Sequence, residues 1–369
     1  MTDDIEAVFG RAGCEGALCV KSLDDGAAIC LRADESVVPA SVVKVQIALE
    51  AETWFVDGRL DPRERVTMRA ADRTPGPVGI SLFEDDAVFS WRGMVVLMLT
   101  ISDNHATDVL LQRVGVDAVN TTAARLGLTG TVLKSDLQTM LDSIGQDIGC
   151  AGWKDSVDWA SSASAEELAR ADEQLFASRA LDPLQGTRTT PRDMADLVRL
   201  IWTDQAGPVA ACERVRAVMA RQLTRHRIAS GFRSPVRVAA KSGSLVGVVR
   251  NEIGVISYPD AADTPPLSSP ELCRARTMSR SAEPSVLPPH WPSPRFGRKA
   301  RKEPPGIGRQ LPATHELSTF TCMRLGMFTA TGKGFRSRRS SRCGQSPGLW
   351  GGQLLSVLLS TTKVVAVLG

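Results

Sequence analysis

The chain has 369 residues, 43% of them hydrophobic, and a formal net charge of +3 at pH 7. This length predicts one large domain or two small ones. The near-neutral total hides a split, because residues 261–369 carry 16 Lys+Arg against 5 Asp+Glu, whereas the first 260 residues carry 28 basic and 36 acidic side chains. Twelve of the 21 prolines also follow Asp260, so two different compositions meet there.

The N-terminus and the cysteines exclude several classes of protein. Residues 1–6 are acidic and contain neither a basic n-region nor an apolar h-region, so we expect no signal peptide and a cytoplasmic protein. The eight cysteines show no Cys-x-x-Cys and no Cys/His cluster of zinc spacing, which predicts reduced thiols and no metal site. There is no glycine-rich phosphate loop, so we expect no cofactor. The run at 354–367 is too short and too polar for a membrane span.

Strands are predicted near both ends of residues 1–260, with helices between them. The β-rich runs Gly16–Leu23 and Gly26–Arg32 are joined by Asp24-Asp25-Gly26, a good hairpin signal. In chain order, we predict helices at 5–11, 39–50, 94–101, 108–114, 116–126, 191–202 (with Thr190 as N-cap) and 214–223, a loop at 62–90, and strands at 236–240 and 246–257. This order indicates an α+β fold, in which the terminal strands share one antiparallel sheet beside a helical subdomain.

The apolar helix predicted at 39–50 carries a serine and a lysine near its start. Ser41 and Lys44 are three residues apart and therefore share one helix face. A buried lysine can lose its proton near neutral pH and act as the base that activates a serine hydroxyl. The Ser41 N–H at the helix start could also stabilise an oxyanion. Ser-x-x-Lys is a weak pattern, however, because Ser360–Lys363 also matches it.

Two further polar motifs follow apolar runs. Ser102-Asp103-Asn104 follows the helix predicted at 94–101, where it could serve catalysis or simply cap the next helix. Lys241-Ser242-Gly243-Ser244 follows the strand predicted at 236–240. A lysine, hydroxyls and a glycine at a strand edge suit an anionic substrate, although a solvated strand end would give the same sequence.

The order Ser-x-x-Lys, Ser-Asp-Asn, Lys-Ser-Gly resembles the class A serine β-lactamases and the penicillin-binding proteins. The resemblance covers about residues 1–260, including Asp72–Pro77, Ser102–Thr107 and Thr189-Thr190-Pro191. It implies the β-lactamase/transpeptidase-like fold and a serine hydrolase that opens a β-lactam amide. The implied partner is a small-molecule β-lactam or an acyl-D-amino-acid-like substrate. We expect no specific nucleic acid or membrane partner, and a monomer.

The resemblance also implies a role for each motif residue. Ser41 is the implied nucleophile and Lys44 its helix partner. Ser102 is the implied proton relay, and Asn104 contacts the substrate amide.

The strand motif implies substrate-binding residues. Lys241 and Ser242 hold the substrate carboxylate, and Arg250 on the neighbouring strand supports it. The second oxyanion-hole N–H belongs to Ser244, with Gly243 keeping the backbone accessible.

One departure from the family pattern concerns deacylation. Class A enzymes use a glutamate in a Glu-x-x-Leu-Asn loop upstream of the Thr-Thr-Pro helix, and Leu137–Arg188 contains no clean match. The nearest fit begins at Asp172, with Phe176 in place of the asparagine. The candidate deacylation bases are the acids of this interval: Asp172, Glu166, Glu167 and Glu173.

A second departure begins after Asp260. Residues 261–369 are rich in Pro, Arg and Ser without an apolar period, which predicts a basic disordered tail. We therefore expect the domain at 1–260 to lack the family's last strand and C-terminal helix, as a shifted reading frame would produce. Three functions remain open: a β-lactamase-like hydrolase, an esterase or D-alanyl peptidase on the same scaffold, and a penicillin-binding protein that does not turn over.

Overall fold

The computed structural model describes residues 2–246, 248–258 and 363–368, the last six by their backbone, and these residues belong to one compact unit. The helices are α1 (Thr2–Arg11), α2 (Lys44–Val56), α3 (Trp91–Thr100), α4 (Asn104–Val114), α5 (Val116–Arg125), α6 (Leu137–Asp147), α7 (Trp153–Ala160), α8 (Ala165–Phe176), α9 (Pro191–Trp202) and α10 (Val209–Met219). The strands are β1 (Ala17–Ser22), β2 (Ala28–Leu31), β3 (Arg65–Met68), β4 (Ala87–Ser90), β5 (Arg237–Leu245), β6 (Val249–Ser257) and β7 (Lys363–Leu368). The short 3₁₀ helices are η1 (Ala40–Val43), η2 (Ala70–Asp72), η3 (Gly79–Leu82), η4 (Arg179–Leu181) and η5 (Ile228–Gly231).

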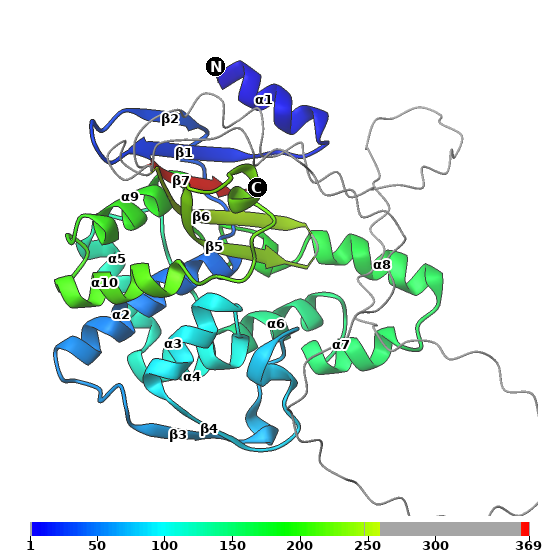
Figure 1. Cartoon of the computed structure of the whole chain (residues 1–369). Helices are drawn as coiled ribbons and strands as arrows, with labels where there is room; N and C mark the ends of the chain where they lie inside the picture. The colour runs from blue at the N-terminus through cyan, green and yellow to red at the C-terminus, as the bar shows by residue number, and fades with distance from the viewer. Residues whose placement is uncertain (1, 247, 259–362, 369) are drawn as a thin grey trace, which may run out of the picture. The chain divides into compact units, whose positions relative to one another are not determined.

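The main sheet has five antiparallel strands in the order β2-β1-β7-β6-β5 (Figure 1). The predicted hairpin of β1 and β2 is present, and Gly26 in its turn has a φ of +73°, a value that glycine adopts easily. The strands predicted at the two ends of residues 1–260 thus lie in one sheet. The predicted α+β fold with a helical subdomain is confirmed.

Strand β7 was not predicted. It pairs with β1 on one side, from Ala17↔Leu368 to Ser22↔Lys363, and with β6 on the other. The prediction that the sheet lacks its last strand is therefore wrong for residues 363–368. The reason is local: Val364-Val365-Ala366-Val367 is a short apolar run of the kind found in strands with neighbours on both sides. The tail predicted to be disordered spans 261–369, and that prediction too is wrong for residues 363–368. The rest of the tail, where the missing helix would also fall, lies outside the described part of the chain.

Helix α9 lies along β1, β6 and β7 on one face of the sheet (Figure 1). Thr190 caps it by accepting a hydrogen bond from the Asp193 N–H at 3.0 Å, and Pro191 occupies its first turn, as predicted. Beyond the first turn, its buried residues are Met194, Ala195, Leu197, Val198 and Ile201. On the other face, Ile5 and Phe9 of α1 pack with apolar side chains of β1, β5 and β6.

The helical part is centred on α2, which contacts α3, α4, α5 and α10. Three of the predictions from sequence change, in this part and at β5. Residues 62–90 contain β3 and β4, which pair with each other, rather than loop alone. Helix α10 begins at Val209, five residues before the predicted start. Strand β5 continues to Leu245, so Lys241–Ser244 lies within a strand and not beyond its end.

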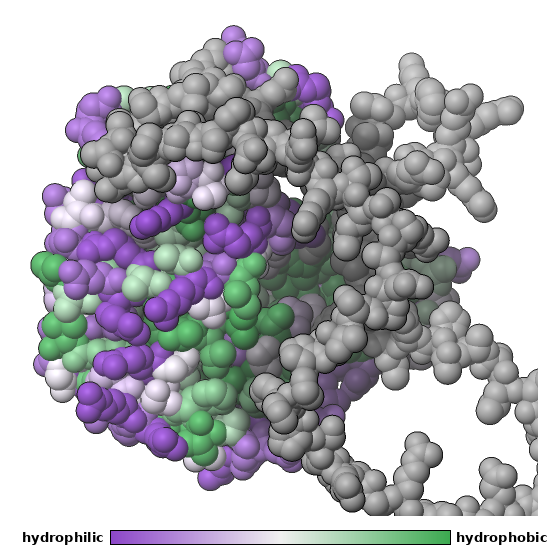
Figure 2. Space-filling model, viewed as in Figure 1, coloured by the Kyte–Doolittle hydropathy of each residue, from purple (hydrophilic) through white to green (hydrophobic). Residues whose placement is uncertain are grey.

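The interval 137–188 folds into helices of its own. Helix α6 packs against α7 and α8 near the end of β5 (Figure 1). On the face shown in Figure 2, hydrophobic and hydrophilic residues are interspersed over the coloured surface. Within the described residues, no helix is both long enough and apolar enough to cross a bilayer.

Candidate active site

The sequence predicted that Ser41 lies within the α-helix. It lies instead in a 3₁₀ turn directly before α2. Val42 and Val43, the last two residues of this turn, are buried and anchor it in the core. The residue before the serine, Ala40, has a φ of +49°, a strained left-handed conformation for a residue with a side chain. Asn251 of β6 holds this segment by donating to the carbonyl oxygens of Val38 at 2.8 Å and Pro39 at 2.9 Å.

Strand β5 passes very close to this turn. A Cβ atom at Gly243 would lie 2.9 Å from the Pro39 carbonyl oxygen and 3.1 Å from the Ser41 nitrogen. A side chain at this position would force the two backbones apart. Glycine is therefore required here for the reason that the sequence suggested, which is close backbone approach.

The hydrogen bonds of β5 show which N–H groups face away from β6. Ser242 lies opposite Glu252 and Ser244 opposite Arg250, with the Gly243–Asn251 pair between them. The Ser242 N–H donates to Gln222 Oε1 at 2.5 Å rather than to β6, so it points to the free edge of the sheet. Because alternate residues of a strand present their N–H groups to the same edge, the Ser244 N–H also points there. Ser41 and Ser244 line the same cavity, so two N–H groups can face one oxyanion.

Lys44 is completely buried at the start of α2. Its Nζ donates to the Ser102 carbonyl oxygen at 2.7 Å and to Asn104 Oδ1 at 2.8 Å. Burial lowers the pKa of Lys44 to about 7, although the charges of Asp103 and Asp108 oppose the shift. A neutral amine can make these two short bonds with its two hydrogens and keep a lone pair for a serine proton.

The hydroxyl of Ser102 lies between two lysines. Its Oγ is 3.4 Å from Lys44 Nζ and accepts from Lys241 Nζ at 3.0 Å. Burial lowers the pKa of Lys241 well below its ordinary value, and the charge of Lys44 adds to the effect. Ser102 has a φ of +66°, and the turn that holds it is fixed by Asp103, which accepts from the Ile80 N–H at 2.6 Å and caps α4. The capping and catalytic interpretations of this motif are therefore compatible.

Ser244 contacts an arginine that was not predicted from the sequence. Arg227 donates to Ser244 Oγ at 2.6 Å, to the Gly243 carbonyl oxygen at 2.7 Å, and to the Asn251 carbonyl oxygen. Arg250, the predicted partner, is exposed, and its guanidinium donates to the Val249 carbonyl at 2.9 Å. The sequence carried no signal for Arg227, because it precedes β5 in a segment without a motif.

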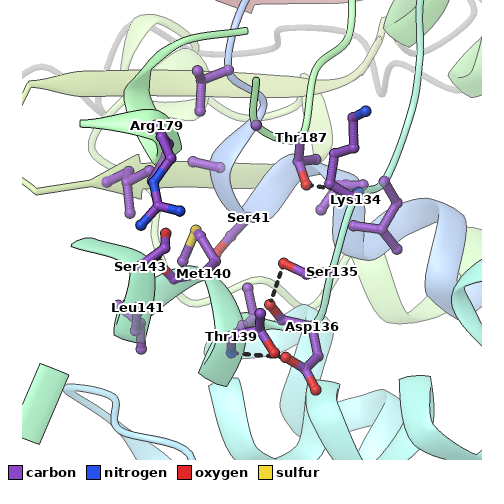
Figure 3. A pocket seen from close by; sticks show the side chains of 18 of the residues that line it. Ser41, Lys134, Ser135, Asp136, Thr139, Met140, Leu141, Ser143, Arg179 and Thr187 are labelled. Atoms are coloured by element: carbon purple, nitrogen blue, oxygen red, sulfur yellow. Dashed lines mark hydrogen bonds between the residues drawn. The ribbon is translucent and has the colours of Figure 1, made fainter. Parts of the chain in front are cut away.

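Ser41 opens into a cavity of about 220 Å³ (Figure 3). Ser41 lies between Met140 and Ser143 of α6 on one side and Lys134 and Thr187 on the other. Apolar and hydroxyl-bearing side chains make up most of the lining, together with two cationic residues and one carboxylate. The cavity residues are Val38, Ala40, Ser41, Val43, Asn104, Leu133–Leu137, Thr139–Leu141, Ser143, Arg179, Ala180, Gln185–Thr187, Ser244 and Leu245.

None of the four predicted deacylation acids lines this cavity. All four lie on α8, where Glu167 accepts from the Ser164 N–H at 2.7 Å and so closes a capping box. One oxygen of Asp172 is buried and has no hydrogen-bond partner among the described residues, and burial raises the pKa of this carboxyl. The acid that does line the cavity is Asp136, whose Oδ1 accepts from the Thr139 N–H at 2.8 Å as the N-cap of α6 (Figure 3).

The fold and the arrangement of Ser41, Lys44, Ser102 and Lys241 define the class of protein: a β-lactamase/transpeptidase-like protein. Residues 1–264 match the beta-lactamase enzyme family, and this chain belongs to that family.

Known proteins agree with the family assignment. The chain is 25% identical over 270 residues to the beta-lactamase regulatory protein BlaB of Streptomyces cacaoi, covering 70% of this chain and 84% of that protein. It resembles in fold a beta-lactamase from Sphaerobacter thermophilus (TM-score 0.55, 23% identity) and PBP-A (TM-score 0.54, 22% identity), with 70% of this chain and 82% of each of those chains covered.

Proposed function

We propose that this protein is a serine hydrolase of the class A β-lactamase type that opens the β-lactam amide by forming an acyl-enzyme at Ser41. The observation that carries the proposal is the pair of short hydrogen bonds that places the Lys44 amine, with its lowered pKa, beside Ser102 and one turn from Ser41.

The proposed acylation moves one proton around the site. Ser41 Oγ attacks the lactam carbonyl carbon while its proton passes to Lys44 Nζ, and the oxyanion lies on the Ser41 and Ser244 N–H groups. The carbon–nitrogen bond then breaks, and the nitrogen takes its proton from Ser102 Oγ, which recovers one from the Lys44 ammonium 3.4 Å away. No hydrogen bond joins Ser41 Oγ to Lys44 Nζ within the described residues, so the serine side chain must turn toward the lysine for attack.

The carboxylate of the substrate would hold the lactam carbonyl in position for attack by Ser41. We propose that Arg227, beside Ser244 Oγ, is the cation that binds it, with Ser242 and Lys241 completing the anionic site. This assignment replaces Arg250, because the Arg227 guanidinium donates to the Ser244 hydroxyl of β5, whereas the exposed Arg250 guanidinium donates to the carbonyl of its neighbour Val249. Asn104 lies on the cavity wall, where it can contact the acyl amide.

Hydrolysis of the acyl-enzyme is proposed to be slow. A general base must lie within hydrogen-bond reach of its water, and the acids of α8 do not line the cavity. The same observation favours a second candidate function, a penicillin-binding protein that acylates without appreciable turnover.

Labelling with benzylpenicillin tests the proposal. After incubation, intact mass should show one added penicillin, and peptide mapping should place it on Ser41. A protein that neither gains mass nor hydrolyses a chromogenic cephalosporin would refute the proposed function.

A further inference from the structure

Beside the proposed site lies a buried carboxylate that no motif includes. Glu252 of β6 is 2% exposed and stands opposite Ser242 of β5. One carboxylate oxygen accepts from Gln222 Nε2 at 3.1 Å and the other from the Ile228 N–H at 2.5 Å. A buried carboxylate is costly unless it is paired, so these contacts suggest a role that needs the charge.

Gln222 extends the contact to the neighbouring strand. Its side chain is buried, and Nε2 also donates to the Thr224 carbonyl at 2.8 Å. Its Oε1 accepts from the Ser242 N–H at 2.5 Å. Gln222 thereby pairs the Ser242 N–H at the free edge of β5. The Ser244 N–H, two residues further along the same edge, is the one proposed to bind the substrate oxyanion. The amide also fixes the start of the segment 222–228 on β5.

The other end of that segment carries Arg227. Ile228, whose N–H is bound by Glu252, is the next residue, so Glu252 fixes the backbone from which the arginine side chain reaches Gly243 and Ser244. The charge of Glu252 also favours the cationic forms of Arg227 and Lys241. Burial lowers the pKa of Arg227, and the negative charge of Glu252 opposes that shift and the shift of Lys241.

We propose that Glu252, acting with Gln222, is a positioning residue that holds Arg227 and the free edge of β5 in the geometry that binds a substrate carboxylate. This inference rests on the proposed function, because it assigns the carboxylate to Arg227. Glu252 itself contacts no substrate. Its effect is exerted through the segment 222–228.

The matched control is a second buried glutamate. Glu52 of α2 is also 2% exposed and lies 3.9 Å from Arg214, and within the described residues no hydrogen bond or ion pair joins its side chain to β5 or to 222–228. The variants are therefore Glu252→Gln, Glu252→Asp and, as control, Glu52→Gln. Each is mixed with benzylpenicillin and with its methyl ester, and the ratio of the two acylation rates is measured by intact mass.

We expect Glu252→Gln to lower the carboxylate-over-ester ratio by about tenfold, the scale of one charge-assisted hydrogen bond. Glu252→Asp keeps the charge and should restore part of the ratio, whereas Glu52→Gln should leave it unchanged. A merely structural role would slow both substrates alike. Equal losses on both substrates, or the same loss in Glu52→Gln, would overturn the proposal.

A second readout does not depend on acylation. Hydrogen exchange of the backbone in 222–231 should be faster in Glu252→Gln than in wild type or Glu52→Gln. If wild type is not labelled by either compound, the proposed function fails, and unchanged exchange in 222–231 would separately overturn the positioning role. Should Glu252→Gln not fold, Gln222→Met removes the same link without neutralising the carboxylate, and it must give the same lowered ratio and faster exchange.

Discussion

The two walls of the cavity differ in how they are built. On one side, η1 and β5 bring Ser41 and Ser244 to the cavity, and buried groups and short hydrogen bonds fix Lys44 and Lys241 through the Ser102 turn. On the other side, the interval 133–187 contributes apolar and hydroxyl side chains, and the carboxylate there is engaged as a helix cap. The first wall carries the groups proposed to form an acyl-enzyme, whereas the one acid that the described residues place in the second wall, Asp136, already accepts a hydrogen bond as a helix cap. Acylation and deacylation therefore have separate structural requirements, and the described residues meet the first set.

The largest expected effect follows from removing the nucleophile. Ser41→Ala should abolish covalent labelling by benzylpenicillin, because the hydroxyl that forms the ester is gone. Ser143→Ala, which changes another serine of the same cavity, is the control and should be labelled normally. Labelling that persists in Ser41→Ala, measured by intact mass, would place the nucleophile elsewhere.

Next in size is the loss of the proposed base. Lys44→Met fills a similar volume without taking a proton and should slow acylation by about 100-fold or more. Lys134→Met, at an exposed lysine of the opposite wall, should change the rate little. Comparable rates in Lys44→Met and wild type, followed by stopped-time mass measurements, would remove Lys44 from this role.

The pH dependence of acylation sharpens the same point. The lysine must be neutral to accept the serine proton, and burial lowers its pKa to about 7. The acylation rate should therefore rise with pH through about 7 and then level off. A wild-type acylation rate that stays flat from about pH 6 to about pH 8 would mean that Lys44 does not supply the base.

A smaller effect is expected at the two arginines. Arg227→Ala should slow acylation by benzylpenicillin about tenfold relative to its methyl ester, the scale of a charge-assisted bond. Arg250→Ala, whose side chain is exposed, should change this ratio less than about twofold. The reverse order would restore Arg250 as the carboxylate ligand.

The smallest effect is expected from the acids of α8. Asp172→Asn, Glu166→Gln, Glu167→Gln and Glu173→Gln should each leave the deacylation rate unchanged within about twofold, because none lines the cavity. Deacylation is followed as loss of the adduct mass after free penicillin is removed. A variant that clears its adduct at least about tenfold more slowly would identify a working base in this helix.

The sequence predicted most of the first wall and little of the second. Ser41, Lys44 and Ser102 stand in short motifs beside apolar runs, and their placement follows from local helix and turn structure. Gln222 and Glu252 are ordinary polar residues in sequence, and their importance comes from tertiary contacts with β5.

The same limit explains the errors in the fold. Strand β7 was missed because a short apolar run far along the chain gives no sign of the neighbours it pairs with. The pairing of β3 with β4 was missed because each has only four residues beside proline- and glycine-rich segments. Roles for the acids of α8 could not be decided from sequence, since the direction of a helix face depends on packing.

The central claim is that this site forms an acyl-enzyme faster than it hydrolyses it. The most direct measurement is rapid mixing of the intact protein with excess benzylpenicillin, followed by intact mass at short and long times and by product analysis. We expect nearly all of the protein to carry one penicilloyl group on Ser41 early, and to keep it while product accumulates slowly. Rapid loss of the adduct together with fast steady-state hydrolysis would contradict the claim, and so would the absence of any adduct at either time.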